Sequence, residues 1–229
     1  MSESGNPPRR GIRSFVRREG RITTAQARAL EELLPVFAMP VQPGTTPADW
    51  FGNGNPLCLE IGTGNGENLY VNARTHPANN YLAVEVHRPG IGQLLLQIAA
   101  AGLQNVRVST ADIHEVLAQL PESCLQEVCI FFPDPWPKTR HHKRRLLQAP
   151  FFAAARRVLA SSGRVRIATD IDDYAESILE CLASAPGWRN LAGPGRRAPR
   201  PRGRCLTRFE RRALEAGRSI HDFLLARGD

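Results

Sequence analysis

The segment 131–145 reads FFPDPWPKTRHHKRR and combines one carboxylate with a dense group of cations. Asp134 lies between two prolines directly after an apolar run, and five basic residues and two histidines follow without another acid. A charge run alone is typical of a solvated face, and a lone aspartate between prolines is typical of a turn. Their combination favours a site in which cations hold an anionic polymer beside one carboxylate.

Three further acids lie at or near the ends of segments that we predict to be strands. Glu60 lies inside the apolar run 57–61, where a carboxylate is costly unless a cation or several N–H donors balance it. Glu85 could accept hydrogen bonds from both hydroxyls of a ribose, or it could cap a helix. Asp112 could reach an adenine edge or cap the helix that follows it. The set fits a nucleoside with a positively charged amino-acid tail, such as S-adenosylmethionine.

A glycine-rich turn, GTGNG, separates the first predicted strand from the helix after it. Gly62 and Gly64 permit positive backbone torsions and let a ligand approach the main chain closely. The spacing is GxGxG rather than the GxGxxG of dinucleotide-binding proteins, so a nucleoside without phosphates is favoured over a pyrophosphate. Trp136, in the turn after the fourth strand, could stack on a base or pack at the edge of the core.

These residues need an alternating framework to bring them together, and the apolar pattern predicts one. Short apolar runs alternate with helical patterns, which indicates an α/β protein with a mostly parallel sheet, helices on both faces and ligands at the carboxyl edge of the strands. Residues 1–56 are predicted to be a basic N-terminal arm and connector, and 57–229 the main domain. The predicted strands are 57–61, 81–86, 106–110, 127–132 and 164–169. The predicted helices are 24–34, 67–75, 91–101, 115–120, 144–159 and 172–184.

The composition and charge of the chain limit the kinds of partner that it could bind. The chain has 229 residues and a formal net charge of +8, with basic residues gathered in 9–28, 138–145 and 189–212. This segregation favours contact with a phosphate backbone at several points. No apolar stretch is long enough to cross a membrane, and five scattered cysteines without a CxxC spacing favour a reduced, cytoplasmic protein without a metal site. Solvated tails without a partner remain the alternative.

Several motifs together resemble a known family, the class I S-adenosylmethionine-dependent methyltransferases, and within it the tRNA (guanine-N7)-methyltransferases. The likeness runs from about residue 12 to the end of the chain, and PDPW followed by K-x-R-H-x-K-R-R is its most specific part. The segment 193–204 is richer in arginine and proline than the family pattern. The motifs are IRSFVRREGRIT (12–23), LEIGTGNGENL (59–69), PDPWPKTRHHKRR (133–145), ATDIDDYA (168–175) and TRFERR (207–212).

The resemblance implies a Rossmann-like fold and methyl transfer from S-adenosyl-L-methionine to N7 of a guanine in tRNA, in the variable loop. Another RNA or another base position is the alternative. The binding partner implied is tRNA. The protein would be a monomer or a homodimer. The cofactor-binding residues implied are Glu60, Gly62, Gly64, Glu85, Asp112 and Asp134. The catalytic residue implied is Asp134. The substrate-binding residues implied are Lys138, Asp170, Thr207, Arg208, Phe209 and Glu210.

The role of Asp134 has more than one interpretation. Guanine N7 carries a lone pair and no proton, so its methylation needs no base; Asp134 could position the guanine and stabilise the developing positive charge. It could instead accept a hydrogen bond from the guanine N1–H or amine. Asp170 could assist it or cap the next helix. A methyltransferase for proteins or small molecules, or a nucleic-acid-binding protein with a vestigial pocket, fits the charge segregation and the intact acids less well.

Overall fold

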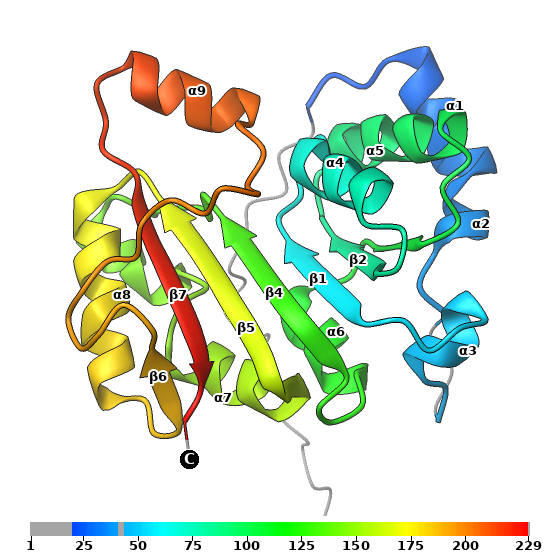
Figure 1. Cartoon of the computed structure of the whole chain (residues 1–229). Helices are drawn as coiled ribbons and strands as arrows, with labels where there is room; N and C mark the ends of the chain where they lie inside the picture. The colour runs from blue at the N-terminus through cyan, green and yellow to red at the C-terminus, as the bar shows by residue number, and fades with distance from the viewer. Residues whose placement is uncertain (1–19, 41–43, 229) are drawn as a thin grey trace, which may run out of the picture.

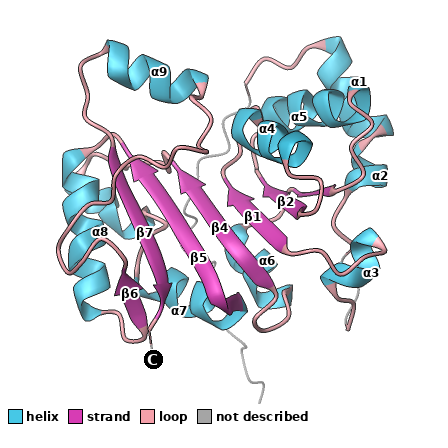
Figure 2. Cartoon of the chain, viewed as in Figure 1, coloured by secondary structure: helices cyan, strands magenta, loops and turns pink. Residues whose placement is uncertain are grey.

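The structure is a computed structural model that describes residues 20–40 and 44–228. Its centre is a seven-stranded sheet in the order β3-β2-β1-β4-β5-β7-β6 (Figure 2). The first five strands along the chain are parallel, whereas β7 is antiparallel to both β5 and β6. The strands are β1 (Leu57–Ile61), β2 (Asn80–Val84), β3 (Val106–Ser109), β4 (Leu125–Phe131), β5 (Leu159–Thr169), β6 (Trp188–Asn190) and β7 (His221–Arg227).

Helices cover both faces of the sheet, as the alternating pattern predicts (Figure 1). They are α1 (Thr24–Glu32), α2 (Leu34–Phe37), α3 (Pro47–Phe51), α4 (Glu67–Thr75), α5 (Arg88–Ala100), α6 (Ile113–Gln119), α7 (Ala149–Val158), α8 (Asp172–Ser184) and α9 (Arg208–Glu215), with a 3₁₀ helix η1 (Thr139–Arg144). Alternate strand residues divide between two apolar clusters because successive side chains point to opposite faces. One cluster holds α1, α4 and α5, and the other holds α6, α7 and α8.

The segment before β1 belongs to the same core as the sheet. Thr23 caps α1 with a reciprocal capping box, and Leu30 of α1 packs in the cluster under α5. Met39 and Trp50 are buried in the other cluster. Packing therefore gives no support to a separate connector ending at residue 56, and that division stays a prediction. Residues 9–19 of the basic arm lie outside the described residues.

Most predicted elements differ from the structure by a few residues at their ends, and one helix and one strand differ most. The helix expected over 144–159 begins only at Ala149, because Pro150 is suited to the first turn of a helix but not to its interior. Before it, η1 occupies Thr139–Arg144 and the chain is extended at Arg145. The strand expected over 164–169 begins at Leu159, so residues 161–163, Ser-Ser-Gly, belong to β5 rather than to a connection before it.

Close contact between α1 and α5 depends on a helical glycine. A Cβ atom at Gly92 would lie 2.8 Å from the backbone oxygen of Gln26. Alanine normally stabilises a helix relative to glycine, but here the clash opposes that gain. We expect Gly92→Ala to lower the free energy of unfolding by about 1–3 kcal/mol in a urea titration. The exposed Ala100 on the same helix, changed to serine, is the control; equal stability of both variants and the wild type would contradict this packing.

Candidate active site

The glycine-rich loop after β1 is tied to the end of β2 by Glu85. The Gly64 N–H donates to Glu85 Oε2 at 2.7 Å, and the N–H groups of Val86 and His87 donate to Oε1 at 2.7 and 2.8 Å. Gly62 and Gly64 have φ of +72° and +56°, and a Cβ atom at either would meet only open space. Glycine therefore serves the backbone conformation here and leaves the loop surface accessible.

Glu60 has fewer hydrogen-bond donors than Glu85. It is buried in β1, and Asn68 Nδ2 donates to Glu60 Oε2 at 2.6 Å. Burial is the main cause that raises the pKa of Glu60 to about 7, although the hydrogen bond from Asn68 opposes it. Thr63, two residues after Ile61, has a buried hydroxyl without a hydrogen-bond partner. Both groups would gain from a ligand with a cationic and an anionic end.

Two adjoining cavities open at this edge of the sheet. A cavity of about 370 Å³ lies between the ends of β1, β2 and β4 and is lined by Gly62, Glu85 and Asp134 among others. A second, of about 410 Å³, is lined by Glu60, Thr63 and α9. Gly62 and the two phenylalanines at the end of β4 border both cavities. The structure thus brings Glu60, Glu85 and Asp134 to one edge, as the sequence predicts.

Asp112 has a different environment from those three acids. Its Oδ1 accepts a hydrogen bond of 2.8 Å from the His114 N–H and so caps α6. Its neighbours Ala111 and Ile113 line the first cavity, but Asp112 itself is not among the lining residues. The helix cap, one of the two roles left open by the sequence, is the contact observed. Binding of an adenine by Asp112 stays a prediction.

The turn that carries Asp134 has an unusual backbone. Phe132 and Trp136 have φ of +54° and +46°, in the left-handed region that non-glycine residues rarely adopt. Such conformations cost roughly 1–3 kcal/mol each and are common at functional sites. Asp134, between these two residues, is exposed and borders the first cavity. The turn therefore presents the carboxylate on a constrained backbone.

Trp136 packs against the protein and does not form an open platform for a base. Its side chain is buried, and the Arg144 guanidinium lies 4.9 Å from its ring centroid. The centroids of the Trp136 and His141 rings are 6.0 Å apart in an edge-to-face arrangement. The role at the edge of the core is therefore the one observed.

The basic run after the turn divides into exposed and buried members. Lys138, Arg140 and Lys143 are exposed, and Arg144 is exposed while stacked on Trp136. Arg145 is buried and bonded within the protein. The expectation that all five cations face a nucleic acid is therefore wrong for Arg145, because its side chain points into the domain.

Helix α9 carries the remaining substrate residues implied by the family resemblance. Thr207 caps it by accepting from the Glu210 N–H at 3.2 Å, and the Arg208 N–H donates to Glu67 at 2.6 Å. Phe209 is 52% exposed, and its ring lies 5.1 Å from the ring of Phe132 at the border of the second cavity. Of these residues, Phe209 has the position best suited to meet a substrate.

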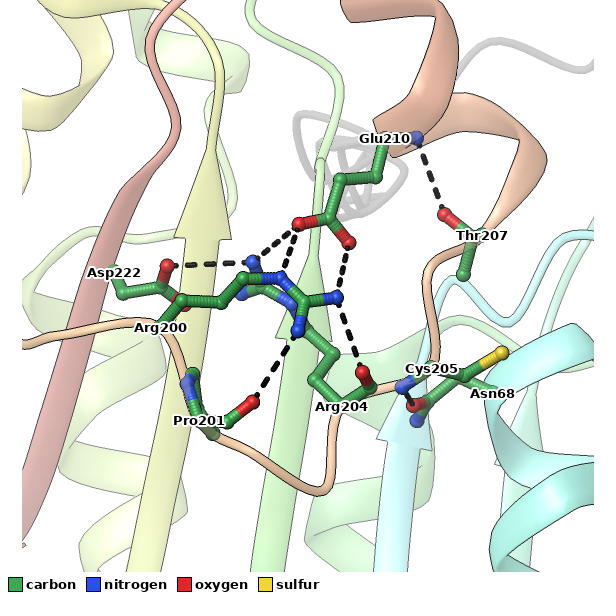
Figure 3. A network of polar contacts seen from close by, with 8 residues as sticks. All are labelled: Asn68, Arg200, Pro201, Arg204, Cys205, Thr207, Glu210 and Asp222. Carbon is green, nitrogen blue, oxygen red and sulfur yellow. Dashed lines mark hydrogen bonds and ion pairs between the residues drawn. The ribbon is translucent and has the colours of Figure 1, made fainter. Parts of the chain in front are cut away.

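Glu210 is the centre of a buried ionic network rather than an open contact (Figure 3). It is fully buried and accepts from Arg200 Nε at 2.8 Å and from Arg204 Nη2 at 2.7 Å; Arg204 also pairs with Asp222 of β7. Burial opposes ionisation of Glu210, but the two arginines outweigh it and lower the pKa of Glu210. For Asp222 burial prevails and raises the pKa. Substrate contact by Glu210 stays a prediction without support from this arrangement.

Two further residues predicted to bind the substrate are Asp170 and Lys138. Asp170, at the end of β5, pairs with Arg218 Nε at 2.7 Å, and it does not cap α8. Lys138 is exposed at the start of η1. Asp170 therefore links β5 to the residues just after α9. Sequence reasoning missed Thr63, Asn68 and Arg204. Thr63 and Asn68 lie within the motif of residues 59–69, which could have identified them, whereas Arg204 had no such signal.

Within the described residues, no group of three or more histidine, cysteine, aspartate or glutamate side chains could hold a metal ion. No helix in the same part of the chain is both long and apolar enough to cross a membrane.

Comparison with solved structures places the fold among the Rossmann-like methyltransferases of class I. The 16S rRNA methyltransferase KamB superposes with a TM-score of 0.57 at 18% identity, over 79% of this chain and 92% of that one. An rRNA methylase from Streptococcus thermophilus gives 0.52 at 12% identity, over 84% and 100% of the two chains. At such identities the likeness concerns the fold alone.

The sequence comparisons identify the family. A family model described as "Putative methyltransferase" matches residues 54–223. The tRNA (guanine-N(7)-)-methyltransferase of Alkalilimnicola ehrlichii is 50% identical over 218 residues, 93% of this chain and 92% of its own length. That of Yersinia enterocolitica is 44% identical over 231 residues, 99% and 95% of the two chains. The chain belongs to the tRNA (guanine-N(7)-)-methyltransferase family.

The pKa of Glu60 predicts an effect on stability. A carboxyl with a raised pKa contributes stability that is present below its ordinary value of 4.5 and is lost as the pH rises through about 7. Glu60→Gln keeps an acceptor for Asn68 but removes the charge. As the pH rises from 5 to 8, the wild type should lose stability that the variant keeps. The difference in free energy of unfolding, variant minus wild type, should therefore increase by on the order of 3 kcal/mol.

Urea unfolding at both pH values measures this difference. Glu115→Gln, at an exposed position of α6, serves as the control and should show little change. A difference between Glu60→Gln and the wild type that is the same at pH 5 and pH 8 would show that Glu60 does not titrate in this range.

Proposed function

We propose that this methyltransferase transfers the methyl group of S-adenosyl-L-methionine to N7 of a guanine in the variable loop of tRNA, with Asp134 as the residue that faces the reacting base. The observation that supports this proposal most is the position of Asp134. It projects from a constrained turn at a cavity that also contains the loop-binding carboxylate Glu85.

The residues of the two cavities fit S-adenosylmethionine. The open space beside Gly62 and Gly64 leaves room for a ligand against the backbone. Glu85 retains lone pairs on both oxygens that can accept from ribose hydroxyls in addition to its three N–H donors. Glu60 can balance the positive charge of the amino-acid tail, and the unpartnered Thr63 hydroxyl can bind its polar end.

Asp134 acts by position and charge in this proposal. When bound, S-adenosylmethionine supplies a methyl group on a positive sulfur; the N7 lone pair forms the new C–N bond and the sulfur keeps the electrons of the broken C–S bond. Positive charge therefore moves onto the purine. A carboxylate held beside the ring stabilises that charge without accepting a proton. Phe209, exposed at the adjoining cavity, offers a ring on which the base can stack.

The exposed cations give the tRNA its phosphate contacts. Lys138, Arg140 and Lys143 follow directly after the turn of Asp134 and point away from the core. A phosphate backbone held there would bring a nucleotide close to the carboxylate. A cytoplasmic location, and the state of the protein as a monomer or homodimer, stay predictions.

Transfer of labelled methyl to an unmodified tRNA transcript tests the reaction. Borohydride and aniline cut RNA at N7-methylguanosine, so we expect one cut, in the variable loop. A transcript made with 7-deazaguanosine lacks the acceptor nitrogen and should take up no label. Label without a cut would place the methyl group on another atom, and no label with cofactor still bound would point to another substrate.

Asp134→Asn tests the catalytic assignment. Loss of the charge should lower kcat by about 10²-fold, as is common when one preorganised electrostatic group is removed. The affinity for tRNA, measured by filter binding, should change little. An equal loss of kcat and tRNA affinity would indicate that Asp134 only binds the substrate.

Substitution of Lys138, Arg140 and Lys143 by alanine tests the phosphate contacts. Each lost contact should reduce the slope of log K against log salt concentration by about one unit, because fewer counterions are released. Arg74→Ala, at an exposed position of α4, removes a charge outside this segment and should leave the slope unchanged. An unchanged slope in the triple variant would exclude these residues as phosphate contacts.

A further inference from the structure

Arg145 connects the turn of Asp134 to helix α8. Its Nε donates to the backbone oxygen of Pro135 at 2.9 Å, and its Nη2 bonds to Asp173 in the first turn of α8. The guanidinium also lies 4.8 Å from the centroid of the Tyr174 ring. Its side chain is only 2% exposed, so these contacts, rather than water, determine its position.

The bond to Pro135 is placed where the turn has few hydrogen bonds of its own. Pro133 and Pro135 lack an N–H group and cannot donate to the rest of the protein. The N-terminal end of the turn is held by the Phe132 N–H, which donates to Ala168 of β5 at 2.8 Å. On the C-terminal side of Asp134, the backbone oxygen of Pro135 is held by Arg145. The two bonds together flank the carboxylate.

We propose that Arg145 is a positioning residue that fixes the direction of Asp134 through the backbone of the turn. This inference rests on the proposed role of Asp134. An arginine is suited to the task because its planar fork binds a carbonyl with Nε and a carboxylate with Nη2 at once. A lysine retains the charge but has a single nitrogen, so it cannot keep both contacts in this geometry.

The charge of Arg145 is balanced by a carboxylate of the same chain, that of Asp173. The side chain of Asp173 is 62% exposed and forms an ion pair with the buried Arg145. The hydrogen bond from Arg145 is the leading cause that lowers the pKa of Asp173. His142 lies beside both groups, with its Nε2 3.1 Å from Arg145 Nη2. A guanidinium engaged in this way is not available for a phosphate, which distinguishes Arg145 from the exposed Lys143 in the same run.

Kinetics of Arg145→Lys in two backgrounds test the proposal. In the wild-type background, we expect kcat to fall by about tenfold or more, since small displacements of a catalytic group can cost up to 10²-fold. KM for tRNA should stay within about twofold, and the salt slope of tRNA binding should not change. In the Asp134→Asn background, the same substitution should cause no further loss of kcat, because it acts through the carboxylate already removed.

Arg107→Lys is a matched control. Arg107 also donates to a backbone oxygen, that of Trp50 at 2.5 Å, and its guanidinium lies 4.7 Å from the centroid of the Phe51 ring, but it borders neither cavity. It should lower thermal stability while leaving kcat at its wild-type value. Asp173→Asn is a second test in case Arg145→Lys does not fold. It removes the charge of the exposed carboxylate that holds Arg145, and it should also lower kcat.

The outcomes separate the two proposals. If Asp134→Asn alone leaves kcat unchanged, the role of Asp134 is wrong. Suppose that Asp134→Asn lowers kcat, and that Arg145→Lys lowers kcat by the same factor in the wild type and in the Asp134→Asn variant. Arg145 then does not act through Asp134. A reduced salt slope for Arg145→Lys would make it a phosphate contact. Wild-type kcat for both Arg145→Lys and Asp173→Asn would also overturn the inference.

Discussion

The backbone from Phe132 to Trp136 is held in a conformation that its residues would not adopt alone, and much of the reactive edge is arranged around it. Two non-glycine residues with positive φ need external contacts to stay ordered. The Phe132 N–H bonds to β5, and the Phe132 ring packs against Phe209 of α9. Arg145 fixes Pro135. The turn therefore depends on β5 and α9, which are distant from it in sequence, and on Arg145, which is itself bonded to Asp173 of α8.

Ion pairs, more than apolar contacts, attach α9 to the domain. Only Glu210 and Ala213 of this helix are buried, and Glu210 is balanced by Arg200 and Arg204. Arg204 also lies 5.9 Å from the Phe132 ring, so the network that holds α9 reaches the turn of Asp134. A buried charge that loses its partner is strongly unfavourable, so moving Glu210 of α9 away from Arg204 would be costly. The arginine-rich segment 193–204 thus contributes structure as well as surface charge.

The parallel strands of the fold could be predicted from the sequence. Which individual charged side chains are buried and which are exposed could not. Apolar runs alternating with helical patterns determine β1 to β5, and the carboxyl edge of these strands determines where Glu60, Glu85 and Asp134 meet. The antiparallel β6 and β7 pair at long range and have no comparable local signal. Within one basic run, exposed Lys143 and buried Arg145 look alike in sequence, since tertiary contacts alone decide which side chain turns inward.

Glu60 and Glu85 carry the same side chain, but their surroundings suit them to different ligand groups. Three backbone N–H groups already stabilise the negative charge of Glu85, so a neutral partner such as a hydroxyl can be added at little cost. Glu60 has one amide donor and a buried position, and its raised pKa reflects a charge that is not fully balanced. A cation beside Glu60 would restore that balance and favour the ionised form. The edge would thus suit a neutral group at β2 and a cation at β1, which agrees with the proposed binding of a nucleoside joined to a positively charged tail.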